Sequence, residues 1–210
     1  MATEQETLVK RGPYKSGVER KKQIIEAARL QLIEQGYHNF SIRKVAKRVG
    51  LSAGNVQHHF SSRLELIAAM LDYVIENYFT EFDQAIANIK DPKEKLFIII
   101  QHVTRDLTTL NTTVFFPEMW SLANHEPEID ELVEEMYRVY RNVYERLAIE
   151  INPALSQTQA ENFALFLASS LEGHTVFIGH NKKHTHACEA VITMAYNMAL
   201  GMLNSGNIPK

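Results

Sequence analysis

The stretch FSIRKVAKRVGLSAGNVQHHF, residues 40–60, predicts two short helices joined by a tight turn. Its first half places Ile42, Val45 and Val49 at the spacing that forms one apolar face of a helix. Gly50 follows the last of these residues, at the position where a helix commonly ends with a positive φ. Helix, turn and second helix in this order are typical of a helix-turn-helix motif.

The second half of the stretch predicts a helix over residues 53–59. Ser52 precedes this helix, as Ser41 precedes the first one, and a serine at such a position accepts a hydrogen bond from a free amide of the first turn. Val56 and Phe60 are spaced to point inward, at i and i+4. The opposite face is therefore free to meet a partner.

That outward face is polar without being acidic. Gly54 and His58 point most directly away from the inward residues, with Asn55 and Gln57 on the flanks. Asn and Gln form paired hydrogen bonds with adenine edges, and His donates to a guanine acceptor or a phosphate. Gly54 costs about 1 kcal/mol of helix propensity relative to alanine, and close approach to another molecule is one reason to tolerate it. The pattern predicts a helix that reads DNA; a solvated helical hairpin is the alternative.

Charge is distributed unevenly along the chain. Residues 10–63 contain twelve Lys/Arg and three Asp/Glu, a net charge of +9, whereas residues 64–210 contain ten and twenty, a net charge of −10. This split indicates a nucleic-acid-binding module joined to a part that does not bind nucleic acid. Gly and Pro interrupt residues 1–18, so we expect a flexible basic arm in which Lys15 can reach DNA phosphates.

Composition narrows the class of protein. With 210 residues, 45% of them hydrophobic, the chain can bury a sizeable core. The single cysteine, Cys188, excludes intramolecular disulfides. No apolar run approaches the roughly 20 residues that span a bilayer, and the first residues lack the pattern of a signal peptide. We therefore expect a soluble cytoplasmic protein with no membrane partner.

Helical periodicity continues to the end of the chain without any strand pattern, so we expect an all-α fold of about nine helices. The spacing Ser62-x-x-Glu65 is that of a capping box and starts a helix that keeps one apolar face for more than six turns. We expect residues 19–64 to form the helix-turn-helix domain and residues 65–210 to form a second helical domain.

The last two expected helices, residues 156–180 and 187–204, are apolar almost all round. A helix without a wide polar face must be buried on more than one side. Packing against the same pair in a second copy would bury both helices, so we expect a homodimer; a buried central helix in a monomer is the alternative. The residues expected at the dimer interface are Phe166, Phe177, Val191, Met194 and Met198.

The segment SIRKVAKRVGLSAGNVQHHF followed by SSRLELI resembles the DNA-binding signature of TetR-type transcriptional regulators. The resemblance covers residues 19–67 in sequence and the rest of the chain in helix count and length. It implies a dimer that binds a palindromic operator, usually as a repressor, and a ligand-binding and dimerisation domain in which a small molecule shifts the spacing of the two reading heads. The residues expected to contact DNA are Lys15, Ser41, Arg43, Lys44, Ser52, Ala53, Gly54, Asn55, Gln57, His58 and Arg63.

Two positions depart from the pattern of the family. Gln57 stands where the family commonly has an aromatic residue, usually Tyr, that anchors a phosphate. Gln57 can hold a phosphate more weakly or contact a base edge, and both roles stay open. Arg63 stands where Lys is common and keeps the positive charge needed for a phosphate contact.

The resemblance places the ligand cavity among the middle helices. Pro117 is expected to give a broken or short helix within residues 111–124, and such a segment cannot pack tightly everywhere. Aromatic side chains at helical spacing also form plain core, so both interpretations stand. The effector is expected to be mostly apolar or aromatic, although Glu118 and Glu172 leave a cation possible. The candidate ligand contacts are Phe116 and Trp120, which we prefer, together with His102, Phe115, Met119, Tyr137, Tyr140 and His174.

Other classes of function explain the sequence less well. It contains no paired carboxylates on a common face, no nucleophile elbow and no phosphate loop, so we expect neither an enzyme nor a cofactor. His180, His184 and His186 could suggest a metal site, but Lys182 and Lys183 would repel a cation there. A protein-interaction bundle would explain the apolar terminal helices but not the division of charge.

Overall fold

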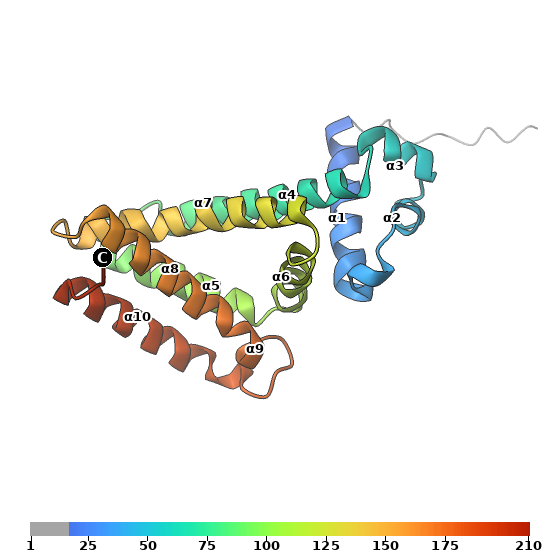
Figure 1. Cartoon of the computed structure of the whole chain (residues 1–210). Helices are drawn as coiled ribbons and strands as arrows, with labels where there is room; N and C mark the ends of the chain where they lie inside the picture. Colours follow the sequence, from blue (N-terminus) through green and yellow to red (C-terminus); the bar gives the residue numbers. More distant parts are fainter. Residues whose placement is uncertain (1–16) are drawn as a thin grey trace, which may run out of the picture.

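The computed structural model describes residues 17–210, which form ten α-helices and two short 3-10 helices with no β-strand in that range (Figure 1). The helices are α1 (Gly17–Gln35), η1 (Tyr37–Asn39), α2 (Ile42–Arg48), α3 (Ala53–His59), α4 (Arg63–Ile86), α5 (Pro92–Leu107), α6 (Leu110–Ala123), α7 (Pro127–Ile151), α8 (Gln157–Gly173), α9 (Thr175–Ile178), η2 (Thr185–Ala187) and α10 (Cys188–Ser205). Because α9 is a single turn, nine longer helices remain, and the expected all-α fold is confirmed. Lys15 and the rest of the expected arm up to residue 16 lie outside the described residues.

The helix starts follow the serine caps that the sequence predicts. The Oγ atoms of Ser41, Ser52 and Ser62 each accept a hydrogen bond from the backbone N–H three residues further on, at 3.0–3.3 Å. Each bond satisfies an amide that the first turn leaves without an intrahelical partner. Gly50 has a φ of 67°, which a side chain rarely adopts, and it turns the chain from α2 towards α3.

We call α1, η1, α2 and α3 the head, and α4 to α10 the body. The two lie at opposite ends of an elongated molecule, and α4 runs out of the head along the body beside α7 (Figure 1). Ile24, Val45, Val56 and Phe60 are buried in the head, and the same apolar cluster continues through Met119 of α6 into the first half of α7. The head therefore packs directly on α6 as well as on α4.

The body buries a second cluster between α4, α5, α7, α8 and α10. Tyr144 and Phe163 are fully buried there, and α10 lies outermost beside α5 (Figure 1). Within residues 17–210, no helix has both the length and the hydropathy needed to cross a membrane.

The expectation that Pro117 breaks a helix is wrong, because α6 runs without interruption through it. Proline removes one backbone hydrogen bond from a helix interior. Phe115 and Met119, on either side of Pro117, are buried in the core, and this packing holds the helix together across the missing bond.

Candidate DNA-binding surface and ligand cavity

The face of α3 that points away from the head core is polar and exposed. Gly54, Asn55, Gln57 and His58 are all exposed, whereas Val56 is fully buried. A Cβ added at Gly54 would approach only the Ser52 Oγ, at 3.9 Å, so the fold itself does not require a glycine there. The helix thus presents small and hydrogen-bonding side chains on a surface that a DNA groove could admit.

The other head residues expected to contact DNA differ in their exposure and in whether their side chains already have a partner. Arg43 and Lys44 are exposed on α2, and Ser41 and Ala53 are partly exposed. The Lys44 Nζ is held on the head, because it donates to the Gln35 Oε1 at 3.1 Å and to a backbone carbonyl at 2.9 Å. Within residues 17–210, Arg43 makes no hydrogen bond or ion pair, so its charge is available to a phosphate.

The Arg63 side chain, which we expected to contact a DNA phosphate, packs on Tyr37 instead. Its guanidinium carbon is 3.8 Å from the centroid of the Tyr37 ring, and its NH2 group donates to the Tyr37 carbonyl oxygen at 3.1 Å. The Arg63 Nε is buried without a partner within the described residues. This side chain is committed to the α1–α2 connection, a role that its position in the sequence could not disclose.

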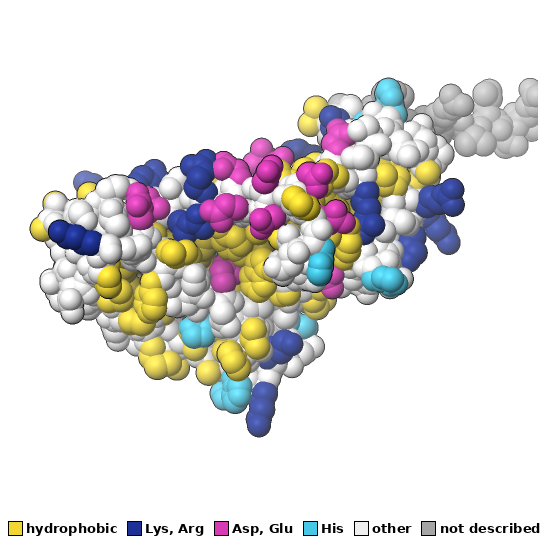
Figure 2. All heavy atoms as spheres, viewed as in Figure 1, with side chains coloured by type: hydrophobic (Ala, Val, Ile, Leu, Met, Phe, Trp, Pro, Cys, Tyr) yellow, Lys and Arg dark blue, Asp and Glu magenta, His cyan; other side chains and the backbone are white. Residues whose placement is uncertain are grey.

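Figure 2 shows that Lys and Arg side chains outnumber Asp and Glu over the head, whereas Asp and Glu gather along the edge formed by α4 and α7, with some Lys and Arg among them. Some of the basic residues on the body pair with acidic ones, as Arg138 does with Glu135 and Arg141 with Glu134. Phosphates would therefore be attracted to the head and repelled from this edge of the body.

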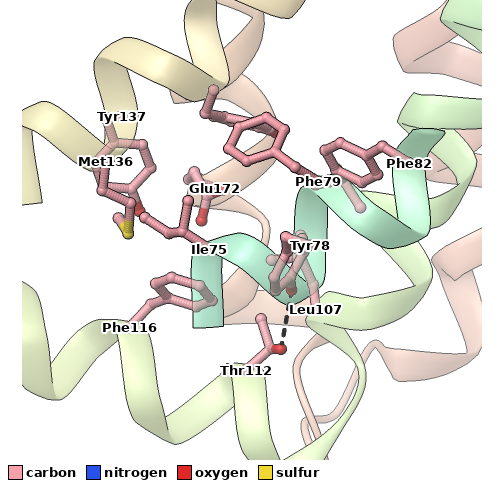
Figure 3. A pocket seen from close by; sticks show the side chains of 12 residues that line it. Ile75, Tyr78, Phe79, Phe82, Leu107, Thr112, Phe116, Met136, Tyr137 and Glu172 are labelled. Atoms are coloured by element: carbon pink, nitrogen blue, oxygen red, sulfur yellow. Dashed lines mark hydrogen bonds between the residues drawn. The ribbon is translucent and has the colours of Figure 1, made fainter. Parts of the chain in front are cut away.

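The body contains a cavity of about 40 Å³ enclosed by α4, α5, α6, α7 and α8 (Figure 3). Aliphatic side chains fill part of its wall, and six aromatic rings form the rest: Tyr78, Phe79, Phe82, Phe116, Tyr137 and Tyr140. The polar lining residues, apart from tyrosine hydroxyls, are Thr112 and Glu172, and no Lys, Arg or His belongs to the lining. The cavity is thus an aromatic box with one carboxyl group.

Glu172 enters this box from α8 near the end of the helix. Its Oε2 atom is buried and has no hydrogen-bond partner within the described residues. Burial raises the pKa of Glu172 to about 7; a hydrogen bond with Tyr137 opposes this rise and the nearby Asp106 adds to it. The Tyr137 hydroxyl accepts from the Trp120 Nε1 at 2.8 Å, which fixes its position beside the carboxyl group.

A second carboxyl group lies behind the opposite wall. Thr112 donates a short hydrogen bond to the Asp106 Oδ2, and its hydroxyl pairs with the Tyr78 hydroxyl at 3.3 Å (Figure 3). Burial raises the pKa of Asp106, and hydrogen bonds from Thr112 and Thr109 oppose this rise. The polar groups around the aromatic box are therefore hydroxyls and acids.

Of the residues expected to line a ligand site, the structure brings Phe116, Tyr137 and Tyr140 to the cavity. The other five lie elsewhere, because helical spacing alone does not say which face of a helix meets which neighbour. Phe115 and Met119 are buried in core, Trp120 lies behind Tyr137 in an adjoining hollow of about 220 Å³, His102 faces Glu81 at 3.2 Å, and His174 is the partly buried C-cap of α8. Trp120 is therefore not part of the inner wall, contrary to our preferred pair.

Sequence reasoning missed the wall supplied by α4. Ile75, Tyr78, Phe79 and Phe82 lie at helical spacing, a pattern that indicates plain core equally well. The sequence nevertheless contained two signals. Three aromatic residues, Tyr78, Phe79 and Phe82, lie within five positions of one helix, and Glu172 is an acidic residue in an otherwise apolar run.

The apolar residues that the sequence singled out for a dimer interface fall into two groups. Phe166, Phe177, Met194 and Met198 are exposed on α8, α9 and α10, with Leu165 and Val176 exposed beside them. Val191 is only 8% exposed and packs within the chain itself, so it does not belong with the exposed group. Within residues 17–210, no three His, Cys, Asp or Glu side chains are grouped to hold a metal ion.

An all-α body carrying a capped helix-turn-helix head with an exposed polar second helix defines the class: a DNA-binding transcriptional regulator. Residues 24–70 match the family described as "Bacterial regulatory proteins, tetR family". The HTH-type transcriptional regulator BetI of Yersinia pestis (strain Pestoides F) is 27% identical over 177 residues, which are 82% of this chain and 87% of that protein. Residues 24–70 therefore carry the DNA-binding domain of the TetR family, and the chain as a whole is similar to a transcriptional regulator.

Solved structures share the whole fold. The fatty acid degradation regulator FadR from Bacillus halodurans matches with a TM-score of 0.72 and 17% identity, over 90% of this chain and 97% of that one. A transcriptional regulator from Saccharomonospora viridis, solved in complex with choline, matches with a TM-score of 0.69 and 17% identity, over 92% of this chain and all of that one. The arrangement of head and body is thus one that other regulators have.

Proposed function

We propose that this protein is a cytoplasmic repressor that binds a palindromic operator as a homodimer and is released by a small organic cation. In this proposal residues 19–64 read DNA, and residues 65–210 bind the effector and dimerise. The observation that carries the choice of effector is the buried, unpartnered Oε2 of Glu172 in a wall of aromatic rings.

The chemistry of the cavity favours a cation over a neutral apolar molecule. Aromatic faces attract cations, and quaternary ammonium groups are commonly held in such boxes. A buried carboxylate without a partner is costly, and a bound cation offsets that cost. A neutral apolar ligand without a hydrogen-bond donor would leave the Glu172 Oε2 without a partner. The choline bound by the Saccharomonospora viridis regulator has the charge and the methyl-rich surface that this box suits.

The small size of the cavity suggests how binding of the effector could change the structure outside the cavity. A volume of about 40 Å³ holds roughly one to three water molecules, so a trimethylammonium group must push the walls apart. The walls belong to α4, α5, α6, α7 and α8, and the first residues of α4 pack against the head. An effector that fits only the expanded state shifts the population towards that state.

The choice of effector is tested by comparing choline with its neutral isostere 3,3-dimethylbutan-1-ol in calorimetric titrations. We expect choline to bind at least about tenfold more tightly, because only the cation pairs with Glu172 and the ring faces. Glu172→Gln, which keeps the size of the side chain, should abolish the preference. Glu161→Gln, on the exposed side of the same helix, should preserve it. Equal affinities of the wild-type protein for the two molecules would rule out a cationic effector.

The DNA-reading role of α3 is tested by separating specificity from general affinity. We expect Asn55→Ala or His58→Ala to cost about 1–3 kcal/mol of discrimination between a selected operator and random duplex DNA. Arg43→Ala should weaken both complexes alike and reduce the salt dependence by about one ion. Fluorescence anisotropy at several salt concentrations measures both quantities. Equal losses on the two duplexes after Asn55→Ala would place the reading contacts elsewhere.

A further inference from the structure

Tyr37 lies in η1, the connection between α1 and the helix-turn-helix, and it is held from two sides by the body. From α6, the Glu118 Oε2 accepts a hydrogen bond from the Tyr37 backbone N–H at 2.9 Å. From α4, Arg63 stacks on the Tyr37 ring and donates to the Tyr37 carbonyl oxygen at 3.1 Å. Glu118 of α6 thus binds the backbone N–H of Tyr37, and Arg63, the first residue of α4, binds its backbone carbonyl and its ring.

The turn around Tyr37 is built closely around this contact. Gly36 has a φ of 70°, and a Cβ added to it would come within 3.2 Å of the Glu118 Oε1. The absence of a side chain at Gly36 therefore lets the carboxyl group reach the Tyr37 amide. Lys44 of α2 and Gln31 of α1 both donate to the Asn39 carbonyl at the other end of η1, so displacement of η1 would be passed to α2.

The two helices that hold Tyr37 also line the ligand cavity. Phe116 and Thr112 of α6 and Tyr78 of α4 belong to its wall (Figure 3). Phe116 and Glu118 are two positions apart, about 200° around the helix, so one points into the cavity while the other points to the head. A rotation or shift of α6 that enlarges the cavity must then move the Glu118 carboxyl group relative to the Tyr37 amide.

We infer that Tyr37 is the joint through which cavity expansion reaches the DNA-reading head, and that Glu118 and Arg63 are the positioning residues that couple the two. Neither residue touches the cavity or the exposed face of α3. Their role is to make the orientation of the head depend on the positions of α6 and α4. Coupling of this kind commonly changes affinity by about 5- to 150-fold.

The test is a double-mutant cycle on operator affinity, with two independent ways of filling the cavity. One is saturating choline; the other is Val103→Phe, which adds a ring from α5 and needs no ligand. In the wild-type background we expect either treatment to weaken operator binding at least about fivefold. In Glu118→Ala the same treatments should weaken it less than twofold, while calorimetry finds the choline affinity unchanged. Glu118→Gln, which still offers an acceptor to the Tyr37 N–H, should restore the response, and Glu131→Ala on α7 is the matched control.

The outcomes separate this inference from the proposed effector. If choline does not bind, but Val103→Phe weakens operator binding and Glu118→Ala cancels that effect, the joint stands and the choice of effector fails. If choline binds, but Glu118→Ala leaves the response as large as in the wild-type protein, the joint is overturned and the cation site stands. Should Val103→Phe fail to fold by circular dichroism, Val103→Leu takes its place. An operator affinity that neither choline nor the filled cavity changes also overturns the joint.

Discussion

Phe177→Glu is expected to convert the protein from a dimer to a monomer that no longer holds an operator. Phe177 is 59% exposed on α9, and Met194 is 63% exposed on α10; both belong to the surface that is expected to form the interface. Large apolar side chains that stay exposed together mark a surface that is covered by a partner. A carboxylate buried at such a contact would have no counter-charge and would be strongly unfavourable.

The loss of operator affinity should be larger than the loss caused by removing a single protein–DNA contact. A dimer binds a palindrome through two heads, and the second head binds intramolecularly, which strengthens binding by about 10²- to 10⁴-fold. We expect Phe177→Glu to lose that factor in anisotropy measurements and to sediment as a monomer at micromolar concentration. Lys183→Glu changes a charge in the adjacent exposed loop and should leave both properties intact. A dimer that survives Phe177→Glu would show that the interface lies elsewhere.

The affinity for a permanent cation such as choline is expected to rise with pH and to level off above about pH 7. Glu172 binds the cation when it is ionised, and the pKa of Glu172 in the free protein is about 7, because burial favours the neutral acid. Below that pH a proton competes with the cation, so the affinity should fall by about tenfold per pH unit. Calorimetry between pH 5.5 and 8 measures the slope.

The groups that face Glu172 do not reverse this sign. Burial holds the pKa of Tyr137 and Tyr140 above the usual tyrosine value, so both stay neutral throughout this range. Asp106 reaches the box only through Thr112, and Arg141, in the outer hollow, is paired with Glu134 at 2.6 Å. Glu172→Gln should give a flat profile, as should 3,3-dimethylbutan-1-ol with the wild-type protein. A choline affinity independent of pH in the wild-type protein would exclude Glu172 as its partner.

The same shift predicts how stability depends on pH without a ligand. The folded protein keeps a proton on Glu172 up to about pH 7, whereas the unfolded chain releases it near the ordinary value for glutamate. Folding therefore takes up a proton between these two values. The contribution of Glu172 to the free energy of unfolding should increase as pH falls from about 7 and be complete below the unfolded pKa. Wild type and Glu172→Gln compared by chemical denaturation isolate this contribution.

Most of the features that could be predicted from the sequence depend on interactions between residues close together in the chain. Ser41, Ser52 and Ser62 cap their helices through bonds to amides only three residues away, and Gly50 turns the chain by its own φ. The exposed face of α3 follows from helical period once Val56 is buried. These features depend on neighbours within one or two turns, so the fold class and the family could be inferred before any contact was known.

Tertiary packing decided the rest, because it brings together faces of helices that lie far apart in the chain. The Glu172 Oε2 atom lacks a partner because α4 and α7 surround it with rings, and Val191 is buried because α10 turns it inward. Tyr37 and Glu118 are 81 positions apart, and nothing within one turn of either residue foretells their hydrogen bond. Helical periodicity identifies the apolar side of each helix. Which of these sides pack against one another is decided only in the folded bundle, and this packing forms the cavity and the contact of Tyr37 with α6 and α4.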